Sequence, residues 1–255
     1  MAELALIDRP LHEPFAQLDT RTISAAEFLA DVDACAEQLP PASHYLPLVD
    51  DRYHFLVLFG AALARGAATL LPTRREAGAL GELRQSYPGL VTVATDTSAA
   101  ADSHDTVAAA IDRVVRIEPG ASGSAAPNPR VPETQTAAVA FTSGSTGTSQ
   151  QHVKSWGLLA HGAAAHGTIL PAEFQQPLTI VGTVPAWHMY GFEWTALLPL
   201  RCPATVSCGA DFYPADLLRS LALAGDRCLW WRPPCTCVPC SAASLRRPRC
   251  RPGCS

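Results

Sequence analysis

Apolar residues along the chain change repeatedly between two spacings. Where they recur every three or four positions the pattern predicts helices, and where they form short runs it predicts strands. The predicted helices span residues 24–39, 51–65, 76–86, 106–112, 156–166, 192–200 and 214–223. The predicted strands span residues 45–49, 67–71, 90–95, 114–117, 137–141, 178–184 and 204–207. This alternation predicts an α/β fold: an incomplete doubly wound, mostly parallel sheet with flanking helices.

Two short signals mark helix ends. Ser24 and Glu27 have the spacing of a capping box, in which each side chain accepts a hydrogen bond from the other residue's backbone at the start of a helix. Gly66 follows the helix predicted at 51–65 and is typical of a residue that stops a helix. Both helices therefore have a boundary signal of their own, besides their apolar spacing.

Composition divides the chain into four stretches. Residues 118–136 are rich in Pro, Gly, Ser and Ala and have no apolar period, which is typical of a surface linker. We therefore expect a first α/β subdomain at 1–117, a linker at 118–136, a second α/β subdomain at 137–226 and an irregular tail at 227–255.

The tail differs from the rest of the chain in charge and in cysteine content. It holds six arginines, no acidic residue and six of the nine cysteines, so it carries +6 while residues 1–226 carry −10. The C-x-C-x-x-C pattern from Cys235 to Cys240 could bind zinc, but Arg and Pro fill the gaps and the tail has no histidine. A shifted reading frame in GC-rich coding sequence would give the same mixture. We favour this second interpretation, with the break near Arg227 or Cys228.

Composition and charge exclude several classes of protein. Hydrophobic residues make up 48% of the chain and charged residues 16%, which excludes a disordered, highly charged chain. The net charge of −4 argues against nucleic-acid binding through bulk positive charge. The start, MAELALIDRP, lacks the segments of a secretory signal, and the longest apolar run, residues 55–64, is too short to span a membrane. We expect a cytoplasmic location, no membrane span and no metal held by side chains.

Glycine and hydroxyl side chains follow the strand predicted at 137–141. Two glycines let backbone N–H groups point into one concavity, an arrangement that binds anions, and Lys154, the chain's single lysine, could add a positive charge. The spacing is neither that of a Walker loop nor that of a dinucleotide fingerprint, and a plain Ser/Thr-rich turn is the alternative. Because a buried strand precedes it, we interpret the stretch as a phosphate-binding segment made of Thr142, Ser143, Gly144, Ser145, Thr146 and Gly147.

The same stretch, TSGSTG, resembles the signature loop of the adenylate-forming enzymes, a family of acyl-CoA synthetases, aryl-acid ligases and peptide-synthetase adenylation domains. Residues 46–67 look like the family's early strand, helix and A-x-x-x-G-A turn. Residues 184–191, VPAWHMYG, look like its P-x-x-H-x-x-G segment. The resemblance covers roughly residues 20–225, and QHVKSW at 151–156 is similar to a divergent branch, the AMP-ligases of aryl-polyene pigment pathways.

The resemblance implies an activity and a set of site residues. It implies that a carboxylic acid attacks ATP, with Mg²⁺ on the phosphates, to give an acyl-adenylate and pyrophosphate, and that coenzyme A or an acyl carrier protein then accepts the acyl group. The phosphate-binding segment would hold the β- and γ-phosphates, and Lys154 would offset their charge. His188, Tyr190 and Gly191 would border the acid pocket. No catalytic residue is assigned.

The chain also departs from the family. Most members continue the loop with Pro-Lys-Gly where this chain has SQQ at 149–151. The family's downstream Y-G-x-T-E segment, ribose-binding aspartate and C-terminal catalytic lysine have no counterpart here. We therefore expect a truncated ligase with little or no adenylation activity. The alternatives are a non-catalytic nucleotide- or phosphate-binding module that uses the same loop, and a zinc-binding interaction protein built around the tail.

Overall fold

The computed structural model describes residues 1–19, 21–96, 110–121, 123, 126–142, 150–170, 178–209, 214–225 and 227–231. Most of the helix predicted at 106–112, residues 143–147 of the phosphate-binding segment and residues 232–255 of the tail lie outside this part of the chain. All the other predicted helices and strands are present, with ends that differ by a few residues.

A six-stranded sheet contains the strand that leads into the phosphate-binding segment. In spatial order its strands are β10 (Gln150–Ser155), β9 (Thr136–Thr142), β5 (Ala68–Leu71), β4 (His44–Pro47), β6 (Val91–Thr95) and β7 (Arg113–Val115). All neighbours are parallel except β10 and β9, which are antiparallel. The sequence did not predict β10, because QQHVKS has neither an apolar run nor an apolar alternation, as suits a mostly exposed edge strand.

A five-stranded sheet is built from segments far apart in the chain. In spatial order its strands are β13 (Cys228–Trp231), β11 (Leu178–Gly182), β12 (Ala204–Ser207), β2 (Pro14–Gln17) and β3 (Thr22–Ser24). Only β2 and β3 are antiparallel neighbours. A separate pair joins β1 (Glu3–Ala5) to β8 (Arg130–Pro132).

The two large sheets divide the chain differently from the predicted subdomains. The six-stranded sheet combines β4–β7, which come before residues 118–136, with β9 and β10, which come after them. The five-stranded sheet likewise pairs β2, near the start of the chain, with β12. Which strands belong to each sheet therefore depends on hydrogen bonds between segments far apart in sequence. No local sequence pattern reveals these pairings.

The predicted start of the irregular tail also differs from the structure. Residues 228–231, CLWW, form β13 and pair in parallel with β11. Cys228, Leu229 and Trp231 are buried there. Burying these apolar side chains in the sheet is more favourable than exposing them to water. Regular structure therefore continues past Arg227 to Trp231, and the shifted reading frame stays a prediction.

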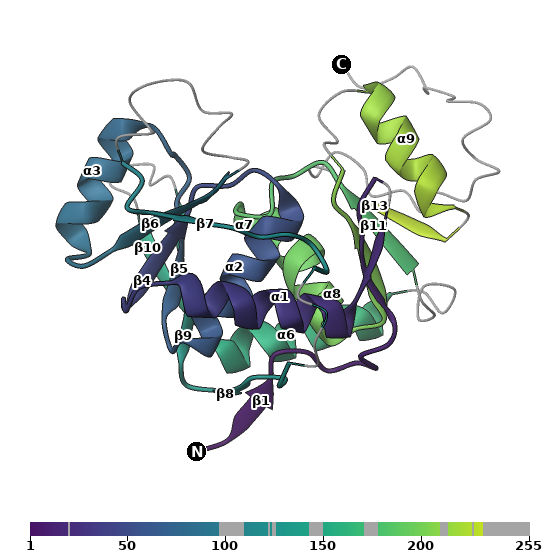
Figure 1. Ribbon diagram of the computed structural model, residues 1–255, viewed down its shortest axis with the longest axis horizontal. Helices are drawn as coiled ribbons and strands as arrows, with labels where there is room; N and C mark the ends of the chain where they lie inside the picture. The colour runs from purple at the N-terminus through teal and green to yellow at the C-terminus, as the bar shows by residue number, and fades with distance from the viewer. Residues whose placement is uncertain are drawn as a thin grey trace.

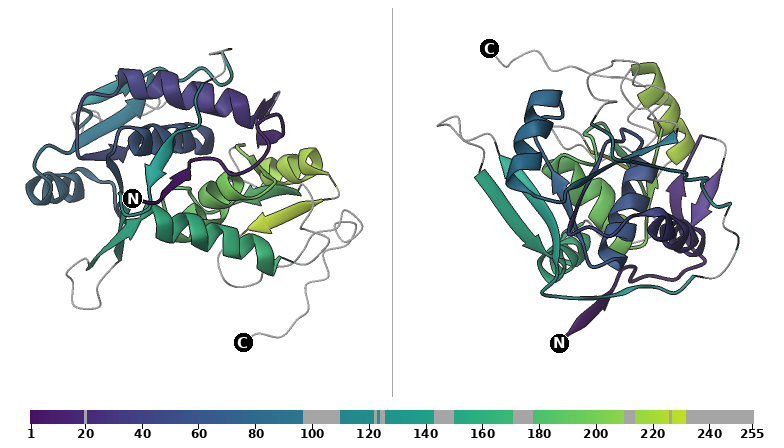
Figure 2. Two further views of the ribbon diagram at one scale, coloured as in Figure 1. Left: turned by 90° about the horizontal axis from the view of Figure 1, so that it is seen from below. Right: turned by 60° about the vertical axis from the view of Figure 1, so that its left-hand side comes forward.

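Helices fill the space between the two sheets and cover both outer faces (Figure 1). The central helices are α1 (Ala25–Gln38), α2 (Arg52–Ala64), α6 (Trp156–Ile169) and the continuous stretch of α7 (Met189–Gly191), the π-helical η2 (Phe192–Leu197) and α8 (Leu198–Arg201). On the outer faces, α3 (Ala77–Ser86) packs on the six-stranded sheet through Leu80 and Leu83, and α9 (Pro214–Ala224) packs on the five-stranded sheet through Leu221. The views in Figure 2 show the same layers from two other directions.

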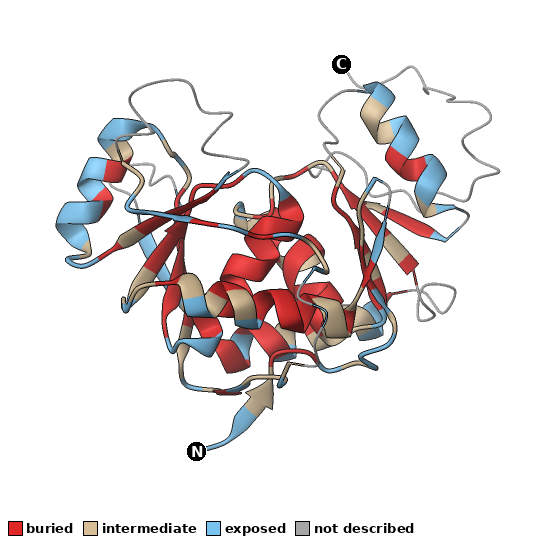
Figure 3. Cartoon of the chain, in the orientation of Figure 1, coloured by how far each residue is buried: buried red, intermediate tan, exposed pale blue. Residues whose placement is uncertain are grey.

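Burial is greatest in the central helical layer (Figure 3). Every residue of α2 from Arg52 to Leu63 is buried, as expected of a helix that is apolar on all sides. By contrast, α3 and α9 bury only the face that meets their sheet. The buried central helices therefore fix the position of one sheet relative to the other. Side chains that reach from one sheet to the other are then held in a defined geometry.

Both helix-boundary signals are confirmed. The side chain of Ser24 accepts a hydrogen bond from the backbone of Glu27 at 3.2 Å, and the backbone N–H of Ser24 donates to Glu27 Oε2 at 2.8 Å. Gly66 has φ of 74°, the left-handed conformation that follows a helix end. These local patterns were readable from the sequence because each depends on neighbours in the chain.

Candidate functional site at the carboxyl ends of the sheets

The phosphate-binding segment begins where β9 ends. Thr142, the last residue of β9, pairs with Gln150, the first of β10, so residues 143–149 connect the two strands of a hairpin. The Thr142 side chain is exposed, and its Oγ1 lies 3.4 Å from His152 Nε2. Ser143, Gly144, Ser145, Thr146 and Gly147 lie outside the described residues, so their predicted role stays a prediction. In the sequence they follow β9, and the carboxyl ends of parallel strands are where α/β sheets bind ligands.

Lys154 lies on β10. It pairs with Ala138, four positions before Thr142 on β9. Its side chain is half-buried and lines a pocket of about 200 Å³ together with residues of α6 and of the α7–η2 stretch, among them His166, Met189 and Glu193. An inward-pointing charge on an edge strand also protects that edge from pairing with another chain. Contact between Lys154 and a phosphate stays a prediction.

The predicted acid-pocket residues follow the carboxyl end of β11. His188 is exposed and precedes α7, and Tyr190 is half-buried, with its ring stacked on Trp231 at 4.6 Å between centroids. Gly191 is buried, and a Cβ there would lie 2.2 Å from the carbonyl oxygen of Pro185. Close packing of two backbone segments therefore accounts for glycine at this position. The structure brings all three residues to one turn of the chain.

A stack of four rings continues from Tyr190. Trp231 stacks on Trp194 with 4.0 Å between ring centroids, and Trp194 stacks on His166 with 5.0 Å. The Trp231 indole also donates a hydrogen bond to the carbonyl oxygen of Tyr190 at 3.2 Å. The stack joins β13, η2 and α6 on the inner side of the five-stranded sheet, so β13 helps to hold the segment that carries Tyr190.

Arg52, which the sequence analysis did not single out, bridges the two sheets. It begins α2, directly after β4, and its buried guanidinium donates hydrogen bonds to the carbonyl oxygens of Gly182 at 2.6 Å and Val184 at 3.4 Å. Gly182 ends β11, and a Cβ there would lie 2.6 Å from a methyl group of Thr195. The carboxyl ends of the two sheets therefore meet at this arginine.

Arg75 forms a second bridge between the same two edges. It lies in the connection after β5, and Nη1 donates to the carbonyl oxygen of Val49 at 3.1 Å and lies 3.7 Å from a carboxylate oxygen of Asp50. Its guanidinium carbon lies 4.0 Å from the ring centroid of Trp187, a cation–π contact with the segment after β11. Burial lowers the pKa of Arg75 to about 9, although Asp50 acts in the opposite direction. One arginine among many gives no sequence signal, because only the fold brings these groups together.

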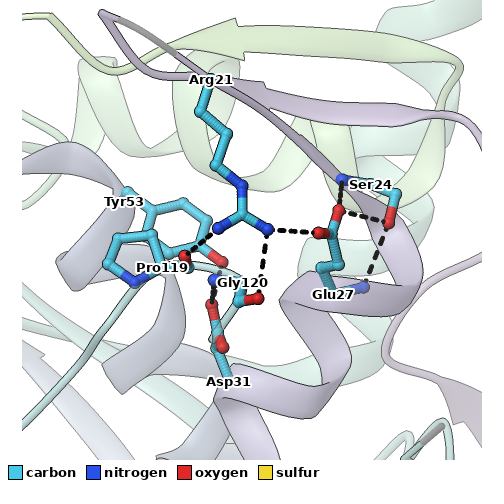
Figure 4. A network of polar contacts seen from close by, with 7 residues as sticks. All are labelled: Arg21, Ser24, Glu27, Asp31, Tyr53, Pro119 and Gly120. Carbon is cyan, nitrogen blue, oxygen red and sulfur yellow. Dashed lines mark hydrogen bonds and ion pairs between the residues drawn. The ribbon is translucent and has the colours of Figure 1, made fainter. Parts of the chain in front are cut away.

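A buried polar network elsewhere has a structural role (Figure 4). Asp31 Oδ2 accepts hydrogen bonds from the Tyr53 hydroxyl at 2.5 Å and from the Gly120 backbone at 2.6 Å. Burial, with the nearby Asp31 carboxylate, raises the pKa of Tyr53, so the phenol stays neutral. Arg21 donates to the carbonyl oxygens at 119 and 120 and to Glu27. The network fastens the stretch predicted as a linker onto α1 and α2, with Asp31 and Tyr53 at its buried end and Arg21 at its exposed end.

The described part of the chain holds neither a cluster of metal ligands nor a membrane-spanning helix. No group of three or more His, Cys, Asp or Glu side chains there could hold a metal ion. Cys235, Cys237 and Cys240 lie outside it, so the zinc alternative is untested. None of the helices in the described ranges combines the length and the apolar character that a bilayer crossing needs.

The fold resembles that of several solved structures. ATP-bound MatB from Rhodopseudomonas palustris is 20% identical, with a TM-score of 0.62 over 84% of this chain and 45% of that one. O-succinylbenzoate coenzyme A synthetase (MenE) from Bacillus subtilis, in complex with AMP, is 18% identical, with a TM-score of 0.65 over 83% and 44%. The N-terminal domain of FACL13 from Mycobacterium tuberculosis, bound to an inhibitor, is 17% identical, with a TM-score of 0.57 over 77% and 53%. No protein-family model matches the chain, and no curated protein matches its sequence.

These likenesses confirm the predicted fold. The α/β architecture implied by the resemblance to adenylate-forming enzymes is the architecture found, and it matches an N-terminal portion of the solved structures. The chain spans about half the length of the structures it matches or somewhat less. At identities of 20% and below, the likeness concerns the fold, and function has to be argued from the site.

Proposed function

We propose that this chain is the phosphate-binding portion of an AMP-forming ligase, whose reaction joins a carboxylic acid to the AMP of ATP and then passes the acyl group to a thiol. One observation supports the proposal above the others. The stretch TSGSTG, which by its composition suits a cradle for phosphate oxygens, begins at the last residue of β9 in a fold that an ATP-bound structure shares. Neither the fold nor the hydroxyl-rich stretch alone would support it.

Each site residue then has a part in the reaction. Backbone N–H groups at Gly144 and Gly147 and the neighbouring hydroxyls would donate to the β- and γ-phosphates, and Lys154 would add a charge if the ligand reaches along β10. His188, Tyr190 and Gly191 would border the acid on the side of the five-stranded sheet. Such a reaction depends on positioning and on electrostatic stabilisation rather than on a covalent side chain. Mg²⁺ would neutralise charge on the phosphates, and coenzyme A or a carrier protein would accept the acyl group.

We further propose that the 255-residue chain binds ATP without turning it over. The support is that the chain covers only 45% of the MatB structure and 44% of the MenE structure. A non-catalytic nucleotide-binding module would behave in the same way in isolation. The two differ when the chain is fused to the part of a matched ligase that it does not span: a ligase portion gains acid-dependent activity, whereas a binding module does not.

Equilibrium binding of MgATP to the purified chain tests the proposal. We expect the double variant Gly144→Ala, Gly147→Ala to weaken ATP binding by about tenfold or more, because side chains would close the concavity and restrict its backbone. Gly81→Ala, on the exposed side of α3 with no atom within 4 Å of the new Cβ, is the matched control and should leave binding unchanged.

Two results would argue against this account. Equal ATP affinity in the wild type and the Gly144→Ala, Gly147→Ala variant would remove the segment from the site. Acid-dependent exchange of pyrophosphate into ATP by the 255-residue chain would contradict the proposed lack of turnover, while leaving the phosphate-binding role intact.

A further inference from the structure

Three nitrogen donors at the contact between Arg75 and Trp187 have no acceptor. Nε and Nη2 of Arg75 and Nε1 of Trp187 are buried and, within the part of the chain that the structure describes, make no hydrogen bond. Arg75 uses only Nη1, which donates to the carbonyl oxygen of Val49. Buried N–H groups without an acceptor are uncommon in proteins, and here two neighbouring side chains share the deficit.

The nearby carboxylate does not resolve this deficit. Asp50 lies 3.7 Å from Nη1 of Arg75, beyond hydrogen-bond distance, and its side chain is 80% exposed, whereas that of Arg75 is 15% exposed. The Asp50 charge is therefore largely solvated by water while the guanidinium is not. A buried cation with open donors favours an anion that supplies oxygen acceptors.

The position of the pair links it to the proposed site. Leu71, which ends β5, pairs with Ala140 on β9, so Arg75 follows a strand that is the parallel neighbour of the strand leading into the phosphate-binding segment. Trp187 comes from the other sheet, in the segment between β11 and α7. Side chains from both sheets therefore meet, with the Arg75 guanidinium carbon 4.0 Å from the Trp187 ring centroid, at the edge where ligands bind in parallel sheets.

We propose that Arg75 and Trp187 form an oxyanion site, in which Nε and Nη2 of Arg75 and Nε1 of Trp187 donate hydrogen bonds to oxygens of a phosphate or a carboxylate. The inference rests on the proposed function and adds to it the residues that hold an anionic group of the nucleotide or of the acid. The planar fork of a guanidinium matches two oxygens of either group. Because the three nitrogens are enclosed, the anion reaches them only when the Trp187 ring shifts on Arg75.

Nuclear magnetic resonance of the indole N–H groups tests this directly. The chain has five tryptophans, and Trp187→Phe identifies the resonance of Trp187. Inorganic pyrophosphate and acetate are titrated separately into the wild type. We expect one or both to move the Trp187 resonance downfield, as a hydrogen bond to oxygen does. A shift with pyrophosphate alone assigns the site to the nucleotide, and a shift with acetate alone assigns it to the acid. No shift with either anion would overturn the inference.

Affinity measurements supply the second arm. We expect Arg75→Gln to weaken binding of the anion that shifts the Trp187 resonance by about tenfold or more. Arg74 is an adjacent, exposed arginine paired with Glu76, and we expect Arg74→Gln to weaken binding of the same anion by less than about twofold. Should Arg75→Gln fail to fold, Arg75→Lys keeps a charge but loses the fork, and it too should bind more weakly. Equal affinity in either folded Arg75 variant would contradict the assignment.

The outcomes separate this inference from the proposed function. If ATP binding depends on Gly144 and Gly147 but no anion reaches Trp187, the function stands and the Arg75 site fails. If an anion binds at Arg75 and ATP does not bind the chain, the Arg75 site stands and the proposed function fails.

Discussion

Gly191 lies where two backbone segments touch, and the absence of a side chain there is a packing requirement. The nearest atoms to a Cβ at this position would be the carbonyl oxygens of Pro185, at 2.2 Å, and Val184, at 2.9 Å. Backbone atoms cannot rotate aside as the end of a side chain can. The glycine of the P-x-x-H-x-x-G stretch therefore shapes the turn that presents His188 and Tyr190, whatever these residues bind.

We expect Gly191→Ala to destabilise the protein by about 1–3 kcal/mol, because it forces apart segments that are already in contact. Gly81→Ala should instead be neutral or stabilise by about 0.5–1 kcal/mol, since alanine is the better helix former and has open space around it. Urea unfolding of both variants measures the difference. Equal urea midpoints for the Gly191→Ala and Gly81→Ala variants would mean that the turn at Gly191 can accommodate a side chain.

Arg52 and Arg75 show what residue-level reading of a sequence cannot supply. Each makes its decisive contacts across a long stretch of chain: Arg52 with Gly182, and Arg75 with Trp187. The phosphate-binding segment, by contrast, could be proposed because its glycines and hydroxyls are adjacent in sequence. Local chemistry is readable from the chain, whereas the partners of a long charged side chain depend on the fold.

At the scale of the elements, local signals decided how well each was predicted. The start of α1 and the end of α2 were predicted because a capping box and a glycine mark them. The missed strands lack such marks: β2 and β3 have four and three residues, and β10 is mostly exposed and polar. Short or edge strands form because a neighbouring strand is present, so their pattern is weak.

The capping box of α1 makes stability depend on pH. The hydrogen bond from the Ser24 backbone, with further bonds from the Ser24 hydroxyl and Arg21, holds the pKa of Glu27 below its usual value despite some burial. A carboxyl group whose pKa is lowered by folding stabilises the protein above its unfolded pKa, and that contribution is lost as pH falls through the folded pKa. The affected pH window therefore lies below 4.5, the ordinary pKa of a glutamate side chain.

We expect Glu27→Gln to lower the free energy of unfolding at pH 7, by about 0.5–1 kcal/mol, and to lower it less once the pH falls below the window. Urea unfolding of wild type and variant at pH 7 and at pH 3 measures the two differences. A difference that is the same at both values would mean that the Glu27 charge does not contribute to the cap.

At the scale of the whole molecule, two mostly parallel sheets face each other across a buried helical layer, and both direct the carboxyl ends of their parallel strands to one region. The phosphate-binding segment leaves one sheet there, and the His188–Gly191 turn leaves the other. Arg52 and Arg75 tie the two together. The fold class could be predicted from the alternation of helices and strands, but the division into two sheets could not, because strands such as β2 and β12 pair across most of the chain.

The account's central claim is that MgATP binds at the carboxyl ends of both sheets, at the segment after β9. Hydrogen–deuterium exchange of the 255-residue chain, followed by mass spectrometry of its peptides with and without MgATP, tests this most directly. We expect slower exchange in peptides covering residues 142–150, with a smaller effect over 183–191, and no change in α9. Unchanged exchange over 142–150 at saturating MgATP, or protection confined to other parts of the molecule, would contradict it.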